Sequence, residues 1–462
     1  MFHRSAVLMA VAGLLACSGF AMADAPKLSL DPTVITADAA ADQGLLMQCL
    51  DKVGVGKALS DAKLNIYGWV ESGYTYNHRH GSDNNSVIFP GPFNHEFGNH
   101  YMLNQAVLRF ERIPDPKKFD VGGLVEVMYG SDAARIHATG LGYNGSDATD
   151  DNNPDDPLAV ANYDPAWQFD IPQAYVNVNL PIGNGLQVMV GKFVTLLSYE
   201  TIDPRGNPFY SHSYLFNAVP FTHVGVLGSY QVNDQLGLKL GVTRGWDIAM
   251  EDNNGCAIDV IGQVSYQLTK QMNLAFNYSV GPENNGDSSH YRVALDPILN
   301  WQVTDALKVG LEGLYVFDGG MNGSPGDTHH YGDVWGAALY AGYKVNDNLT
   351  LNGRLEKAHI NSKNFGLMSG LSSLANDNNN NNNNPDALGA GGNGVGGAVN
   401  AYEITLGVTL TPMPKDQYLK GLSIRPEIRY DFTDSTANKF FNAQGDTFKD
   451  QLTFACDVIF AF

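Results

Sequence analysis

The chain ends in LTFACDVIFAF (residues 452–462), and this stretch alternates between two kinds of side chain. One set is apolar and ends in aromatic residues: Leu452, Phe454, Cys456, Val458, Phe460 and Phe462. The other set is Thr453, Ala455, Asp457, Ile459 and Ala461. Successive side chains of a β-strand point to opposite faces, so a period of two predicts a strand whose two faces meet different surroundings.

The same alternation recurs upstream. Strands are predicted at 402–410 and at 422–431, and in the second of these Arg425, Glu427 and Arg429 alternate with apolar residues. Further alternating segments lie at 272–279, 307–312 and 349–356. Arginines and carboxylates in such a pattern cannot face lipid, but they suit the water-filled interior of a membrane barrel.

A soluble β-sandwich also alternates apolar and polar residues, so strand length and aromatic position must decide between the two classes. A membrane strand needs about 9–11 residues, against about 5–6 for a typical globular strand. The segments here are long, and aromatic residues lie near their ends: Tyr230, Trp246, Tyr266, Trp301 and Tyr343. We therefore expect an all-β fold, a transmembrane antiparallel β-barrel.

Short polar links and long loops alternate along the chain. The links are 114–116, 181–185, 231–234, 269–270, 304–305, 345–348 and 412–421. The loops are 77–100, 131–170, 199–218, 247–256, 281–290, 319–332, 358–400 and 433–448. Barrels of this class have short periplasmic turns and long external loops, so the pattern predicts about 16 strands within residues 62–462.

Composition argues against several other classes of protein. Acidic residues (48 Asp+Glu) outnumber basic ones (28 Lys+Arg), whereas nucleic-acid binding requires a basic face. After residue 23 no segment has the ~20 consecutive apolar residues that a spanning helix needs. Cys49, Cys256 and Cys456 are the cysteines of that part, and their odd number and spacing predict neither a disulfide framework nor a zinc site.

The N-terminus has the features of an export signal. A short polar start and the apolar segment 5–16 precede AMA at 21–23, so we expect residues 1–23 to be a signal peptide. The alternative is a lipobox that would acylate Cys17. Residues 24–61 are expected to form a periplasmic segment, with a short amphipathic helix within 39–51.

The most distinctive motif is GKFVT (191–195), followed by YE at 199–200 and NPFYSHSYLFN at 207–217. YGWVE (67–71), QAYV (173–176) and PFTHVG (220–225) accompany it. Together these motifs resemble the putative β-barrel porin-2 family, the OmpL-like outer-membrane porins, from about residue 64 to the C-terminus. The resemblance implies a barrel and a porin role, and it says little about the solute.

Charged residues on the predicted inward faces are the candidates for lining the pore. They are Arg109, Glu126, Lys239, Arg292, Lys308, Glu312, Arg354, Glu356, Arg425, Glu427, Arg429 and Asp457. The loop 199–218 is the candidate to fold inward and narrow the pore, with Lys192, Arg205 and His212 as candidate constriction residues. The alternative is an external cap that never enters the lumen.

Lys192 conflicts with the simplest strand register. Counting from Val188 and Val190 places it on the lipid face, where a Lys costs about 2–4 kcal/mol near the bilayer midplane. A bulge at Gly191 that turns Lys192 inward would remove the conflict, and a subunit interface is the alternative. We favour the bulge.

Other motifs have ordinary explanations. His212, Ser213 and Asn217 are residue types found in hydrolase sites, but the sequence shows no nucleophile elbow, and we expect no catalysis. The acidic run 147–156 lacks EF-hand spacing, so a solvated loop is favoured over a Ca²⁺ site. The Asn tract 378–384 and the Gly-rich stretch that follows it cannot build a core. We expect no cofactor and no metal.

Taken together, the sequence predicts a porin in the outer membrane of a diderm bacterium, through which small hydrophilic solutes diffuse passively with weak cation preference. The expected partners are outer-membrane lipid, the solutes and two further copies in a homotrimer, and not nucleic acid. Phe462 ends a strand that resembles the C-terminal signal read by the outer-membrane assembly machinery. The rival hypothesis is a plugged structural or adhesive surface barrel that binds partners through its loops.

Overall fold

The computed structural model describes residues 44–78, 101–138, 140–141, 168–249, 257–283, 288–321, 330–361, 399–434, 440–441 and 447–462. The predicted signal peptide, the lipobox, the acidic run 147–156 and the Asn and Gly tracts between 378 and 397 lie outside these residues.

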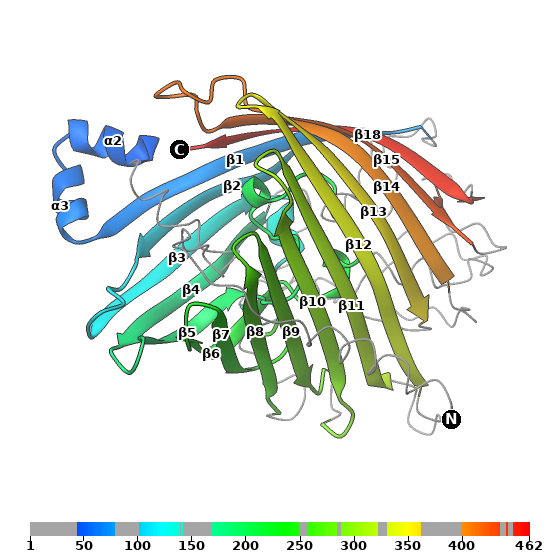
Figure 1. The fold of residues 1–462 in the computed structure, drawn as a ribbon, viewed down its shortest axis with the longest axis horizontal. Coiled ribbons are helices and arrows are strands. Elements are labelled where there is room, and N and C mark those ends of the chain that lie inside the picture. The colour runs from blue at the N-terminus through cyan, green and yellow to red at the C-terminus, as the bar shows by residue number, and fades with distance from the viewer. Residues whose placement is uncertain are drawn as a thin grey trace, which may run out of the picture.

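Sixteen strands close into one antiparallel barrel, which confirms the predicted fold class (Figure 1). The strands are β1 (Leu64–Asn77), β2 (Tyr101–Arg112), β3 (Asp120–Gly130), β4 (Gln168–Leu180), β5 (Leu186–Val194), β6 (Thr222–Gln231), β7 (Leu236–Thr243), β8 (Asp259–Thr269), β9 (Met272–Gly281), β10 (Arg292–Gln302), β11 (Leu307–Met321), β12 (His330–Asn346), β13 (Leu349–Asn361), β14 (Val399–Leu410), β15 (Leu422–Thr433) and β18 (Asp450–Ala461). The pair β16 (Phe440–Phe441) and β17 (Thr447–Phe448) forms a separate two-stranded sheet.

The alternation of the sequence separates two faces of the barrel wall. On β18, Phe454 and Val458 are 44% and 40% exposed, whereas Thr453, Asp457 and Ile459 are almost fully buried. Outward positions of other strands are apolar as well: Val125, Leu240, Leu311, Leu355 and Leu406. An apolar outer face around a polar interior is what a barrel needs in order to cross a bilayer.

The barrel closes where the C-terminal strand meets β1. Phe462 N donates to Gly68 O at 2.9 Å, and Gly68 N donates to Phe462 O at 3.0 Å. A Cβ atom on Gly68 would collide with the carbonyl oxygen of Val107 on β2, so only glycine fits at this close approach. The last residue of the chain is therefore part of the seam.

The short turns lie at one end of the barrel, together with α2 (Leu45–Lys52) and α3 (Gly56–Asp61), as Figure 1 shows. Helix α2 overlaps the range 39–51 in which the sequence predicts a helix, and Met47 on it is buried. Among the described residues, no helix is both long enough and apolar enough to span a membrane.

Several strands run beyond the predicted loop boundaries. Strand β13 continues to Asn361 although the sequence placed the loop from residue 358, and β11 continues to Met321. The small β16–β17 sheet lies within the loop 433–448, which showed no alternation long enough to predict it. The register also shifts between Glu71 and Ser72, where β1 pairs with β2, at a β-bulge or irregularity.

Candidate functional site

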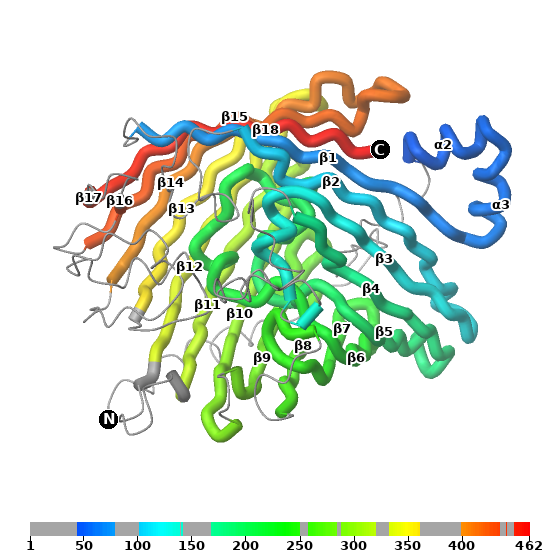
Figure 2. The backbone as a smooth tube through the Cα atoms, turned by 180° about the vertical axis from the view of Figure 1, so that it is seen from behind, coloured from blue at the N-terminus to red at the C-terminus, as the bar shows by residue number. Residues whose placement is uncertain are grey.

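The segment from residue 195 to residue 221, here called the inner loop, lies inside the barrel. It leaves the wall at the end of β5 and returns at the start of β6, and part of it appears in Figure 2 as the green tube within the ring of strands. It holds two short 3-10 turns, η4 (Pro204–Gly206) and η5 (Phe216–Ala218). Phe209, Tyr214 and Leu215 are at most 2% exposed, so the aromatic residues of the loop pack inside the barrel.

The far wall, opposite β5 in the ring of strands, binds the inner loop through carboxylates that accept its backbone N–H groups. Glu356 on β13 accepts from Tyr214 N at 2.7 Å and from Leu215 N at 2.8 Å. Glu427 on β15 accepts from Tyr210 N at 2.9 Å. Two further carboxylates hold the first part of the loop: Asp296 accepts from Ser198 N at 2.7 Å, and Glu312 accepts from Tyr199 N at 3.1 Å.

Arginines of the same wall donate to carbonyl oxygens of the loop. Arg425 Nη1 donates to Pro204 O at 2.8 Å and to Asn207 O at 2.7 Å. Arg354 Nη1 donates to Ser211 O at 2.8 Å. A loop without regular structure needs partners for its buried backbone groups, and hydrogen bonds to charged groups are the strong ones. The wall therefore determines where the inner loop lies.

Each of these arginines is also paired with carboxylates, as a buried charge requires. Arg354 bridges Glu200 of the inner loop at 2.7 Å and Glu403 of β14 at 2.8 Å, and its side chain is fully buried. Arg425 pairs with Asp457 on β18 and with Glu71 on β1. Similarly, Arg429 pairs with Asp431 and donates to His212 O.

Glu200 and His212 form the central contact within the inner loop. Their atoms Oε2 and Nδ1 lie 2.7 Å apart, and Ser213 N donates to the same carboxylate oxygen at 3.1 Å. Burial alone would raise the pKa of Glu200, but Arg354 and His212 outweigh it and hold that pKa at about 2, against an ordinary value of 4.5. Burial lowers the pKa of His212 below its ordinary 6.5.

The residues that suggested a hydrolase serve to shape this loop. Ser213 is fully buried, and its Oγ accepts from Phe216 N at 3.0 Å at the start of η5. Asn217 Nδ2 donates to Ser213 O at 2.9 Å. The ring of His212 stacks on Phe216 with ring centroids 4.1 Å apart. These contacts join neighbouring parts of one turn.

Away from the far wall, on the near side of the barrel, the inner loop contacts β1 and β2. The contact is a stack of charged and aromatic groups. The guanidinium groups of Arg109 and Arg205 lie 4.6 Å and 4.2 Å from the ring centroid of Trp69. Asp203 joins them, 3.2 Å from Arg109 and 2.6 Å from Arg205. Arg109 also pairs with Glu126 on β3. Cation–π contacts and ion pairs together hold both arginines in place.

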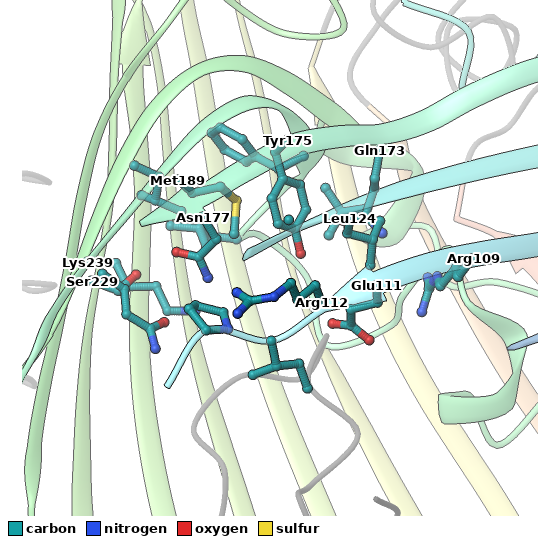
Figure 3. A pocket seen from close by; sticks show the side chains of 18 of the residues that line it. Arg109, Glu111, Arg112, Leu124, Gln173, Tyr175, Asn177, Met189, Ser229 and Lys239 are labelled. Carbon is teal, nitrogen blue, oxygen red and sulfur yellow. The ribbon is translucent and has the colours of Figure 1, made fainter. Parts of the chain in front are cut away.

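Two cavities lie between the inner loop and the near wall. One, of about 290 Å³, is bordered by Arg109, Glu126, Asp203 and Arg205. The other, of about 190 Å³, lies toward the short turns, and Figure 3 shows Arg112, Glu111, Asn177 and Tyr175 around it, with Lys239 at one side. Arg109, Gln173 and residues 194–196 border both cavities, so the two adjoin.

Ten of the twelve predicted pore residues fall into two groups. Glu312, Arg354, Glu356, Arg425, Glu427, Arg429 and Asp457 lie on walls that the inner loop covers, or next to them, and all are buried. Arg109, Glu126 and Lys239 border the two cavities. Arg292 pairs with Asp318 at 2.6 Å, and Lys308 lies 6.0 Å from the ring centroid of Tyr199. That these side chains line the path of a solute stays a prediction.

Sequence reasoning missed Glu200 and Asp203 as site residues, although both lie in the predicted constriction loop 199–218. A signal was available for Asp203, which lies two residues before Arg205, but none for Glu200, which lies twelve residues before His212. The wall partners of these two carboxylates, Arg109 and Arg354, are far away along the chain. Such pairs depend on which wall the loop reaches, and no local pattern specifies that.

The bulge expected at Gly191 is absent. No register shift interrupts the pairing of β5 with β4 or with β6. Instead, Gly191 has φ +139°, a conformation that side chains rarely adopt, and a Cβ there would meet Ala174 O. Lys192 is only 5% exposed, and its Nζ lies 3.3 Å from Asp170 Oδ2. An ion pair, not a bulge, therefore accommodates this lysine.

Comparisons with known proteins agree with this architecture. A family model described as "Putative beta-barrel porin-2, OmpL-like" matches residues 63–462. The outer membrane channel DcaP of Acinetobacter baumannii is similar, with TM-score 0.50 and 13% identity, over 86% of this chain and 97% of that one. OmpF of Salmonella typhi, in complex with daunomycin, has TM-score 0.50 and 11% identity over the same shares. At these identities the solved structures show a shared fold. No curated protein matches the chain.

Proposed function

The chain belongs to the putative β-barrel porin-2, OmpL-like family, a family of outer-membrane channels, and we propose that it lets small hydrophilic solutes diffuse passively through its lumen. We also propose that it catalyses no reaction, and the porin family and the barrel fold support this. The outer membrane of a Gram-negative bacterium is where such barrels act.

The observation that carries this proposal is the course of the inner loop across the barrel. Sixteen strands leave an aqueous channel unless something narrows it. The loop is bound to the far wall by Glu356, Glu427, Arg354 and Arg425, and the adjoining cavities lie on the near side. The proposed path therefore runs between the loop and strands β2–β8.

Stepwise ohmic conductance in planar bilayers tests the proposal. The rival function, a plugged surface barrel, also has a supporting observation, since the inner loop fills much of the lumen with buried aromatic side chains. Purified barrels that insert but carry no current would support the rival. Uptake of small sugars or amino acids by liposomes that contain the protein is the complementary measurement.

We further propose a weak preference for cations. Around the two cavities, Arg109, Arg112, Arg205 and Lys239 are balanced by Glu111, Glu126, Glu200 and Asp203. The preference should come from the formal charge of −20 on the whole chain. Its field is screened within about 8 Å at physiological ionic strength, so selectivity should fade as salt rises. A reversal potential that shows anion preference at low salt contradicts this.

The proposal includes a homotrimer, export through a signal peptide at residues 1–23, and insertion by the outer-membrane assembly machinery. Chemical cross-linking in intact outer membranes tests the trimer, because three linked copies are expected. N-terminal sequencing of the membrane form tests the cleavage after Ala23.

A further inference from the structure

A hollow interrupts the outer face of the barrel between β11 and β15. It has a volume of about 340 Å³, and its outward lining includes Ala337, Leu339, Leu355, Lys357, Tyr402 and Phe432. It forms because small residues meet there: Ala337 on β12 pairs with Gly313 on β11. The apolar residues around Ala337 are long, so the small ones leave a depression in a surface that faces lipid.

Lys357 is the one cation of this lining, and aromatic rings flank it. Lys357 on β13 pairs with Ala337 on one side and with Tyr402 of β14 on the other. Its Nζ lies 5.3 Å from the ring centroid of Trp335 and 5.8 Å from that of Tyr402. Those rings are themselves stacked, Trp335 on His359 at 4.9 Å and Tyr402 on Phe432 at 5.0 Å. The ammonium group is thereby held at a fixed place beside the hollow.

The position of Lys357 fits the headgroup level of the external leaflet. Strand β13 runs from the short turn at 347–348 to Asn361 at the other end of the barrel wall, and Lys357 lies near Asn361. Aromatic belts mark the lipid–water interface, and lysines on the lipid side extend toward it. No ion pair to a carboxylate is found for Lys357 within the described part of the chain. The neighbouring acid Asp434 is bonded to Asn400 at 2.6 Å.

We propose that the hollow and Lys357 form a binding site for one anionic, phosphate-bearing lipid of the external leaflet. An acyl chain fills the depression over Ala337, and the lipid phosphate meets the Lys357 ammonium between the two aromatic rings. The site combines an apolar hollow with a single cation beside it. These two features match the acyl chain and the phosphate of such a lipid.

A second copy of the chain is the other occupant to consider. It would have to fill the same hollow with a side chain and bring a carboxylate to Lys357. The two occupants differ in a measurable way, since a lipid binds to the monomeric barrel and a second copy requires assembly.

Native mass spectrometry of the full chain in detergent tests the proposal. Phosphatidylglycerol is the probe, diacylglycerol with the same chains lacks the phosphate, and glycerol phosphate lacks the chains. We expect one tightly bound phosphatidylglycerol and much weaker binding of either part. Lys357→Met should weaken it about fivefold, the effect of one lysine near an anionic headgroup, and Lys357→Arg should restore it.

Ala337→Leu fills the hollow and should also weaken binding, whereas the matched change Ala341→Leu lies on the same outward face of β12, outside the lining, and should not. The proposal is overturned if Lys357→Met and Ala337→Leu bind the probe like the native chain. Equal binding of diacylglycerol or of glycerol phosphate also overturns it. So does a Lys357→Cys variant that forms disulfide-linked copies in the membrane. None of these readouts depends on conductance.

Discussion

Arg354 Nη1 on β13 lies 2.7 Å from Glu200 Oε1, and this contact joins one wall of the barrel to a loop that starts on the opposite wall. The same guanidinium bonds to Glu403 and to the carbonyl oxygen of Ser211. Because Arg354 and Glu200 are almost fully buried, neither charge has water as an alternative partner. This one arginine therefore pairs with two carboxylates and anchors the inner loop.

Replacing Arg354 by Met should release the loop. The change leaves Glu200 and Glu403 without their cation, and breaking a buried ion pair in this way costs about 3–5 kcal/mol. We expect a lower unfolding temperature in detergent together with larger and noisier single-channel currents. Arg292→Met, which breaks the pair with Asp318 near the external end of β10, is the control. It should lower stability without releasing the inner loop, so its currents should be no noisier than those of the native chain. Quiet, native currents in the Arg354 variant would count against the anchoring role.

Glu356→Gln should loosen the same loop more gently. The carboxylate accepts from two successive backbone N–H groups, those of Tyr214 and Leu215. In glutamine, an NH₂ group replaces one of the two carboxylate oxygens, so a donor would face a backbone N–H donor. We expect the free energy of unfolding to fall by about 1–3 kcal/mol. Proteolysis of the inserted barrel within the inner loop should become faster. Glu111→Gln, whose carboxylate accepts from the hydroxyl of Tyr67, should leave that rate unchanged.

Acid should weaken the loop through His212 and Glu200. Both pKa values are lower in the folded protein than their ordinary 6.5 and 4.5, the second at about 2. The unfolded chain therefore binds more protons, and this part of the stability is lost as pH falls from 6.5 toward 2. Asp132 and Asp247 have pKa values raised by burial to about 7 and 6, so their contribution has the opposite sign.

The difference between the native chain and His212→Gln isolates the histidine part of this effect. Between pH 7 and pH 5, the unfolding temperature of the native chain should fall relative to that of the variant. Parallel curves over this range would show that His212 does not titrate as the structure indicates. Single-channel noise recorded over the same range should follow the same difference.

The architecture was predictable because a lipid-facing barrel imposes the same period on every strand. Phe454 and Val458 face outward as the alternation required, and the predicted short links lie at the junctions between consecutive strands. The inner network was not predictable in the same way. Arg354, Glu356 and Arg425 were correctly placed on inward faces, but an inward face can meet either water or a folded loop. Contacts such as Arg109 with Asp203 join residues far apart in the chain, and no periodicity encodes them.

Phe462 should be needed for assembly of the barrel. Its backbone bonds to Gly68 in both directions at the seam between β18 and β1, and its ring lies against that glycine. Phe462→Asp places a charge at this closing contact. We expect far less heat-modifiable barrel in outer membranes, while the N-terminal segment is still cleaved. Phe110→Asp is the matched aromatic-to-acid change on the outward face of β2, away from the seam. If the Phe462→Asp variant gives as much folded barrel as the native chain, the special role of the C-terminal residue is ruled out.

The central claim is that the inner loop sets the size limit of the pore, and deletion of residues 207–215 tests it most directly. This segment carries Phe209, Tyr210 and Tyr214, and it holds the contacts with Glu356 and Glu427 on the far wall. Deletion should leave a folded, heat-modifiable barrel, because no wall strand is altered. Single-channel conductance is then the measurement. A clear increase in conductance, with passage of larger neutral polymers, is the result we predict, and unchanged conductance from a correctly inserted barrel would contradict the account.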